Sequence, residues 1–120
     1  MSGSKTVILF FLAILITIWI VPVYAEVTLE TYEVVGKSDE FKLYITGVGE
    51  GYSLANAELK VNRKLSPLYC EPDKVALNTD NYLQILDNYL SQPVGKAQAR
   101  PTLSAGMMLL KALQDSFPCK

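Results

Sequence analysis

Apolar and polar residues alternate with a helical period in three stretches of the chain. The first stretch follows Ser38, a residue type that caps helices well, and the acidic residues Asp39 and Glu40 suit the positive end of a helix dipole. Its apolar residues then recur every three or four positions, which predicts one helix over about 39–61. The residues on this apolar face are Phe41, Tyr44, Ile45, Val48, Tyr52, Ala55 and Leu59.

Three glycines, Gly47, Gly49 and Gly51, fall inside this first predicted helix, where each costs about 1 kcal/mol relative to alanine. A phosphate-binding glycine loop would follow a strand, open a helix and usually bring a lysine at fixed spacing, and this context is missing. Gly47 and Gly51 are four residues apart and so share one helix face. We therefore expect them to admit another helix at close range, with a kink or break near Gly49 as the alternative.

The second stretch predicts a helix that begins at Asn78 or Thr79, with Asp80 in its first turn. Asp80 and Asp87 are seven residues apart, on the side that we expect to face solvent. The residues on the opposite, apolar face are Tyr82, Leu83, Leu86, Tyr89 and Leu90.

The third stretch predicts a helix with Pro101 in its first turn and with Phe117 and Pro118 at its end. The apolar run over 107–110 is typical of core packing rather than of a cofactor site. The inward stripe is predicted to be Leu103, Met107, Leu110 and Leu113.

The segments between these helices carry less pattern. Residues 62–77 contain Pro67, Cys70 and Pro72 and predict a long loop, and residues 91–101 predict a second loop. Residues 26–37 are rich in β-branched side chains without a clean period, so a short strand, an extended arm and a disordered start all stay open. The predicted fold class is all-α, a small bundle of three to five helices.

A run of residues that are apolar, apart from Thr17, precedes the predicted helices. It covers residues 7–20, follows the positive charge of Lys5 and is followed by small residues, which is typical of a secretory signal peptide over 1–25. Cleavage would make Glu26 the first residue of a single domain, 26–120. An uncleaved membrane anchor is the alternative, because residues 7–25 are 19 residues long, close to the ~20 that span a bilayer. In either case the rest of the chain leaves the cytoplasm.

The two cysteines, Cys70 and Cys119, bear on how so small a domain is stabilised. A domain of this size buries only about two-thirds of its unfolded surface, so its core is marginal. An even cysteine count in an exported chain indicates one disulfide, with two free thiols as the alternative. Closing a loop of about 50 residues would destabilise the unfolded state by roughly 4 kcal/mol.

Composition excludes several kinds of chemistry. The chain contains no histidine, which rules out Ser-His-Asp and Cys-His catalysis and removes the commonest zinc ligand. We expect no catalytic residue, no metal and no cofactor. Glu71 and Asp73 are the remaining acid pair, but two neighbours in one loop are more typical of a solvated turn than of acid–base catalysis.

The charge of the chain bears on its partners. Without Lys5 the chain has ten basic and twelve acidic residues in no long run of one sign, so nucleic acid and anionic membranes are not expected partners. Lys60, Arg63 and Lys64 cluster at the end of the first predicted helix, where they complement its negative dipole end. The same cluster could steer an acidic partner. Tyr69 is the loop tyrosine most free to contact a partner.

Four motifs give the chain a family resemblance. They are YITGV at 44–48, YCEP at 69–72, YL at 89–90 and ALQDSFPC at 112–119, and the similarity spans about residues 39–119, which is nearly the whole domain. In these motifs the chain resembles the Rap/Tai family of type VI secretion immunity proteins. Many members carry further cysteines where this chain has Phe41 and Lys42.

The resemblance implies a periplasmic, disulfide-bonded, all-helical protein that binds and inhibits a peptidoglycan amidase toxin. It also implies a non-enzyme and a homodimer, because members are often dimeric. The residues expected to contact the toxin lie in the two predicted loops and at the end of the first helix. They are Lys60, Arg63, Lys64, Tyr69, Gln92, Lys96, Gln98 and Arg100.

Two other functions fit a small exported helical protein with one disulfide. An acid-protective periplasmic chaperone would have to switch through carboxylates, which titrate near ~4, because the chain has no histidine. A structural component of an envelope complex, without a toxin partner, would need the apolar segment retained as an anchor.

Overall fold

The computed structural model describes residues 3, 7, 27–73 and 76–120. Within them the chain forms five α-helices, one π-helical segment and no strand, which confirms the all-α fold class and the predicted helix number. The predicted signal peptide and its cleavage site before Glu26 lie outside the described residues, apart from residues 3 and 7. No helix of the described part has the length and apolar character needed to cross a membrane.

The helix α2 (Leu29–Val35) lies in the segment for which the sequence left strand, arm and disorder open. Thr28 caps it, and its side chain accepts a hydrogen bond from the Thr31 N–H. An antiparallel bridge pairs Thr28 with Ser104, and the Leu29 N–H donates to the Leu103 carbonyl at 2.9 Å. The start of α2 is thus held by the segment that leads into the last helix.

The longest helix, α3 (Asp39–Ala57), continues into the π-helical segment η1 (Glu58–Asn62), so the helix predicted over 39–61 is confirmed. The Ser38 hydroxyl accepts from the Phe41 N–H at 3.1 Å and caps its start.

The expected close packing at Gly47 and Gly51 is wrong. Both glycines are exposed, and a Cβ added at either would meet nothing within 4 Å. The close approach occurs at buried Gly49, where an added Cβ would lie 2.5 Å from the ring of Tyr82. The helix runs through Gly49 without a break.

The second predicted helix is α4 (Thr79–Ser91), and its predicted start is confirmed. Asn78 and Asn81 each accept from the other's backbone N–H at 3.0 Å, which forms a capping box. Tyr82, Leu86 and Tyr89 are buried, as expected for the apolar face.

Residues 91–101, expected to be a loop, contain the short helix α5 (Pro93–Gln98). Pro93 at its first position has the backbone angle that a helix start needs. Gly95 packs directly on the Tyr89 carbonyl at the end of α4, where a Cβ would not fit.

The last helix, α6 (Ala105–Ser116), begins later than predicted. Ser104, not the residues around Pro101, caps it by accepting from the Met107 N–H at 3.3 Å. The predicted inward stripe is partly wrong, because Met107 is 45% exposed while Met108 is fully buried. The predicted end at Phe117 is confirmed, since this residue is the C-terminal cap.

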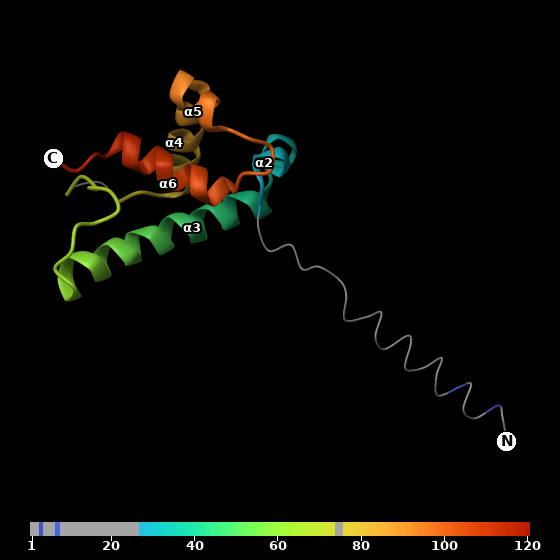
Figure 1. The fold of residues 1–120 in the computed structure, drawn as a ribbon, viewed down its shortest axis with the longest axis horizontal. Helices are drawn as coiled ribbons and strands as arrows, with labels where there is room; N and C mark the ends of the chain where they lie inside the picture. The colour runs from blue at the N-terminus through green and yellow to red at the C-terminus, as the bar shows by residue number, and fades with distance from the viewer. Residues whose placement is uncertain (1–2, 4–6, 8–26, 74–75) are drawn as a thin grey trace.

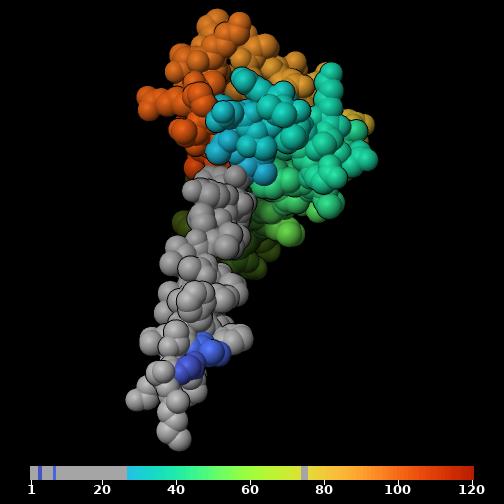
Figure 2. Space-filling view, turned by 90° about the vertical axis from the view of Figure 1, so that its right-hand side faces the viewer, coloured from blue at the N-terminus to red at the C-terminus, as the bar shows by residue number. Residues whose placement is uncertain are grey.

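The core lies where α3, α4 and α6 pack against one another (Figure 1). In Figure 2 the residues of α2 lie between the start of α3 and the orange segment that contains α5 and leads to α6. Every α-helix but α5, and one loop residue, contribute buried apolar side chains. They are Leu29, Phe41, Ile45, Tyr69, Tyr82, Leu86, Tyr89, Ala105, Met108, Leu109, Ala112 and Leu113.

Candidate partner-binding loop

A loop follows η1 and leads to α4. Its described residues, 63–73 and 76–78, contain no helix. Its middle is fixed by Asn56, the buried polar side chain of α3. The Asn56 Nδ2 donates to the Tyr69 carbonyl at 3.0 Å, and its Oδ1 accepts from the Leu68 N–H at 2.7 Å. One buried amide thus satisfies two backbone groups of the loop, which a loop lying against a core requires.

Tyr69 belongs to the core, so the expectation that it is free to contact a partner is wrong. Its side chain is 1% exposed, and its hydroxyl donates to the Glu71 Oε1 at 2.8 Å. Burial, and then the hydrogen bond to Glu71 and its charge, raise the pKa of Tyr69 well above the ordinary value. Tyr69 therefore stays a neutral donor at all physiological pH values.

Glu71 is not the solvated turn residue that the sequence suggested. It is half-buried, and its Oε2 also accepts from the Ser53 hydroxyl at 3.3 Å, so it ties the loop to α3. Asp73, its proposed acid partner, is exposed. No group of three or more potential metal ligands occurs among the described residues.

The predicted disulfide is present. Cys70 and Cys119 are bonded with their Cα atoms 5.0 Å apart, and the bridge joins positions separated by 49 residues. Beside it the Cys70 N–H donates to the Phe117 carbonyl at 2.8 Å, and the Gln114 amide donates to the Leu68 carbonyl at 3.1 Å. The loop and the end of α6 are thus joined by one covalent bond and two hydrogen bonds.

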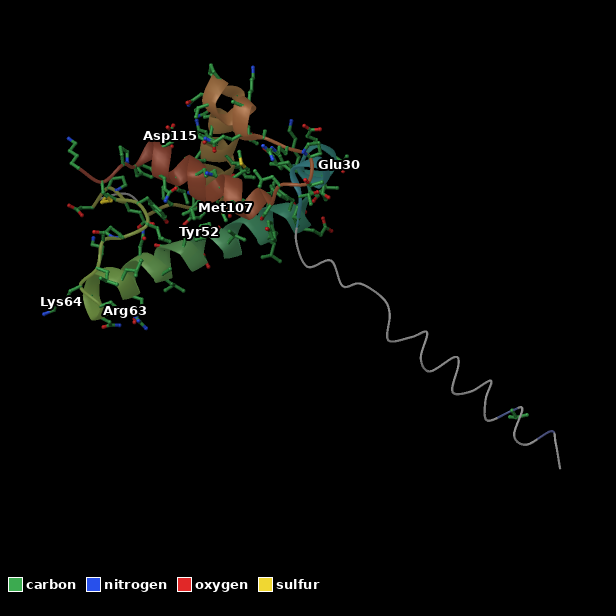
Figure 3. All side chains as sticks on the ribbon, in the orientation of Figure 1. Glu30, Tyr52, Arg63, Lys64, Met107 and Asp115 are labelled. Atoms are coloured by element: carbon green, nitrogen blue, oxygen red, sulfur yellow. A yellow bond between two sulfur atoms is a disulfide. The ribbon has the colours of Figure 1, made fainter. Side chains whose placement is uncertain are left out.

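The first half of the loop protrudes with η1 and is called the basic tip below: Lys60, Arg63, Lys64 and Leu65. All four residues are exposed, and Leu65 keeps 57% of its side chain in solvent. In Figure 3 Arg63 and Lys64 lie beyond the body of the fold, at the far end of the helix that carries Tyr52.

The backbone of the basic tip is ordered by local hydrogen bonds. The Leu65 N–H donates to the Leu59 carbonyl at 2.8 Å and the Arg63 N–H donates to the Glu58 carbonyl at 3.2 Å. Lys64 has φ 52°, a left-handed conformation that reverses the chain here. The Arg63 guanidinium lies 3.5 Å from the Glu58 carboxylate, while Lys60 and Lys64 form no ion pair among the described residues.

The second set of predicted contact residues lies elsewhere on the molecule. Gln92, Lys96 and Arg100 are exposed on or beside α5, and Gln98 is half-buried. The Gln98 Oε1 is buried and has no hydrogen-bond partner in the described part of the chain. In Figure 1, α5 and the end of α3 occupy opposite sides of the fold, so the two sets do not form one site.

Two shallow hollows lie beside α2, on the side that faces α4 and α5. One of about 460 Å³ is lined by Tyr32, Glu33 and Asp87, and a neighbouring one of about 340 Å³ also involves Lys96. Partial burial raises the pKa of the Asp87 carboxyl above its ordinary value. Lys37 and Lys42 line the first hollow as well, so its charge is mixed.

Comparison of the chain with protein-family models, with curated proteins and with solved structures found no match.

Proposed function

We propose that the protein is an exported, periplasmic inhibitor of the immunity type, which binds a peptidoglycan amidase and blocks its cleft without catalysing a reaction itself. The resemblance of its motifs to the Rap/Tai family motivates this function. The single structural observation that supports it is the loop after α3, which is anchored at its middle and exposed at its tip.

The anchoring matters because an inhibitor gains affinity when its contact loop is ordered before binding. Each rotamer-rich side chain that orders on binding costs about 0.5–1.5 kcal/mol, and mobile backbone adds to this cost. Asn56, the Cys70–Cys119 bridge and Gln114 hold residues 68–70 in place. The basic tip is therefore presented from a rigid base, as binding loops usually are.

The chemistry of the basic tip indicates the surface that it fits. Lys60, Arg63 and Lys64 lie at the protruding end with the exposed Val61 and Leu65, so cations and two apolar side chains share it. An apolar contact rimmed by opposite charges is a common arrangement in protein interfaces. The partner is thus proposed to have an acidic rim around an apolar cleft, and the tip to be the part that enters it.

The experiment uses an amidase encoded beside this chain and measures digestion of peptidoglycan with and without the purified exported protein. We expect the wild-type protein to inhibit digestion, and the double variant Lys60→Glu/Arg63→Glu to lose inhibition while its circular dichroism stays unchanged. The matched control is Lys96→Glu/Arg100→Glu, which reverses two exposed charges beside α5.

Two results would overturn the proposal. One is that the wild-type protein neither binds nor inhibits any such amidase. The other is that the α5 variant loses inhibition while the tip variant keeps it, which would move the contact to the second predicted set.

A further inference from the structure

A hollow of about 420 Å³ lies between α3, α4 and the loop that leads to α4. None of its lining residues belongs to the basic tip or to the two hollows beside α2. Its polar lining residues are Glu50, Ser53, Glu71 and Tyr82, and its large apolar ones are Leu54 and Leu77.

Tyr82 is a buried residue of this hollow whose polar atom has no partner. The residue is 2% exposed, and its hydroxyl forms no hydrogen bond among the described residues. By contrast, the Tyr52 hydroxyl donates to the Gly106 carbonyl at 2.9 Å. The Tyr69 hydroxyl likewise donates to Glu71. A buried tyrosine hydroxyl usually has a hydrogen-bond partner, so that of Tyr82 indicates a partner from outside the chain.

Gly49 allows this hydroxyl to reach the hollow. A Cβ at Gly49 would lie 2.5 Å from the Tyr82 Cζ, the ring carbon that carries the hydroxyl. The Tyr82 ring therefore crosses α3 directly against Gly49, next to Glu50 in the chain. Any side chain at position 49 would occupy the space of the ring and displace the hydroxyl.

The hollow carries negative charge. Burial, and then the charges of Glu71 and Glu50, raise the pKa of Tyr82 above its ordinary value, so both carboxylates act on its hydroxyl. Among the described residues no cationic side chain lines the hollow. The Glu71 oxygens accept one hydrogen bond each, from Tyr69 and from Ser53, and each keeps a further lone pair. The hollow thus offers negative charge and free acceptor positions.

We propose that this hollow binds a primary alkylammonium group, the group that ends a lysine side chain or a small diamine. An ammonium has three N–H donors, and the Tyr82 oxygen and the carboxylates of Glu50 and Glu71 are acceptors that match them. Leu54 and Leu77 cover the alkyl chain that carries the charge, because the stem of such a group packs on apolar surface.

A divalent metal ion is a poorer match for the hollow. Such ions are held by several carboxylate and carbonyl oxygens at once. No group of three or more potential metal ligands occurs in the described part of the chain. The apolar walls would also have no role with a bare ion, whereas they suit an alkyl chain.

The test is an NMR titration of the purified, isotope-labelled protein with two amine probes. Cadaverine represents a free diamine, and Nα-acetyl-lysine methylamide represents the lysine side chain of a protein partner. We expect both to cause saturable amide shifts at Glu50, Ser53 and Tyr82. Nα-acetyl-norleucine methylamide has the same alkyl chain without the ammonium and is expected to cause none.

The two amine probes also distinguish the source of the ligand. Tighter binding of cadaverine would identify a free diamine, and tighter binding of the lysine derivative would identify a protein side chain. Either result supports an alkylammonium site.

Two variants test the acceptors. Tyr82→Phe removes a hydroxyl that has no partner in the fold, so its urea unfolding should match that of the wild-type protein while it binds cadaverine about tenfold less tightly. Glu50→Gln is expected to weaken binding by a similar factor. The matched controls are Tyr89→Phe, a buried tyrosine of α4, and Glu40→Gln, an exposed acid of α3, both outside the hollow. They are expected to bind as the wild-type protein does.

Three results would overturn the proposal. Neither amine probe binds, or the norleucine derivative binds as tightly as the lysine derivative, or Tyr82→Phe keeps the wild-type affinity. No amidase is present in this assay, so its outcome does not depend on the proposed function.

Discussion

Gly47 and Gly49 lie two residues apart in α3 and have opposite surroundings. Gly47 is open to solvent, whereas Gly49 is buried beneath the ring of Tyr82, which is itself 2% exposed. Sequence reasoning recognised that the glycines needed a structural reason but assigned it to the four-residue pair Gly47 and Gly51. Spacing along one helix does not show which of its two apolar faces meets the core.

We expect opposite effects when each glycine is replaced by alanine. Gly49→Ala would place a Cβ 2.5 Å from a buried ring that has little room to move, and should destabilise the fold by about 1–3 kcal/mol. Gly47→Ala should stabilise it by about 0.5–1 kcal/mol, because alanine is the better helix residue and meets nothing. Urea unfolding of both variants beside the wild-type protein measures these effects. Equal effects of the two substitutions would contradict the assignment of Gly49 as the contact residue.

Asp87 is a residue whose ionisation works against the fold. Its ordinary pKa is 3.8, and partial burial raises the pKa in the folded chain. Ionisation therefore costs more in the folded than in the unfolded chain. This ionisation lowers the stability of the fold at neutral pH. The loss of stability disappears as the pH falls from the raised pKa of the folded chain to the ordinary pKa of the unfolded chain.

The prediction is that Asp87→Asn is more stable than the wild-type protein at neutral pH, and that the difference disappears below about pH 3.8, where both states are protonated. The matched control is Asp80→Asn, which removes an acidic residue from the first turn of the same helix. Because a carboxylate there interacts favourably with the helix dipole, this control should be slightly less stable at neutral pH. Urea unfolding across a pH series measures both, and a gain in stability for the Asp80 variant alone would contradict the argument.

At the scale of elements, α6, the third of the predicted helices, shows where the sequence pattern no longer determines which helix face is buried. Residues 105–110 are six consecutive apolar or small residues, so several helix faces fit the pattern equally well. Because proline is favoured in the first turn of a helix, the start was predicted near Pro101. The residue that caps the helix is instead Ser104. The resulting shift placed Met107 inside instead of Met108.

The elements missed by sequence reasoning depend on contacts with distant residues. The start of α2 is fixed by Leu103 and Ser104, more than 70 residues away along the chain, and no local pattern shows this pairing. α5 did carry a usable signal, Pro93 at its first position. Helices 39–61 and 79–91, by contrast, have strong caps and a clear polar–apolar period, and both were predicted closely.

The candidate site was predictable in part. The long loop follows from the sequence, because the segment has no helical period and contains Pro67 and Pro72. The cationic cluster Lys60, Arg63 and Lys64 can also be read directly from the sequence. The anchoring role of Asn56 and the burial of Tyr69 do not, because both depend on how the loop folds back onto α3. A polar residue four positions after Tyr52 on the apolar face was the available signal for Asn56.

The disulfide links two elements, so its removal should affect both. We expect Cys119→Ser to lower the free energy of unfolding by an amount on the order of 2–5 kcal/mol. Amide exchange should increase around Leu68 and Cys70 as well as at Phe117, since the bridge and the Cys70–Phe117 hydrogen bond hold the loop to the end of α6. Exchange in α5, which lies away from the bridge, provides the internal reference.

If exchange rises only after Phe117 and the loop keeps its protection, then Asn56 and Gln114 suffice to hold the loop. The bridge would in that case stabilise the chain end alone.

At the scale of the whole molecule, the two sets of predicted contact residues are separated. The basic tip lies at the end of α3 and the second set lies on or beside α5, on the opposite side of the fold. Charge reversal in one set therefore leaves the other set unchanged. Inhibition that depends on Lys60 and Arg63, but not on Lys96 and Arg100, would place the partner at the basic tip.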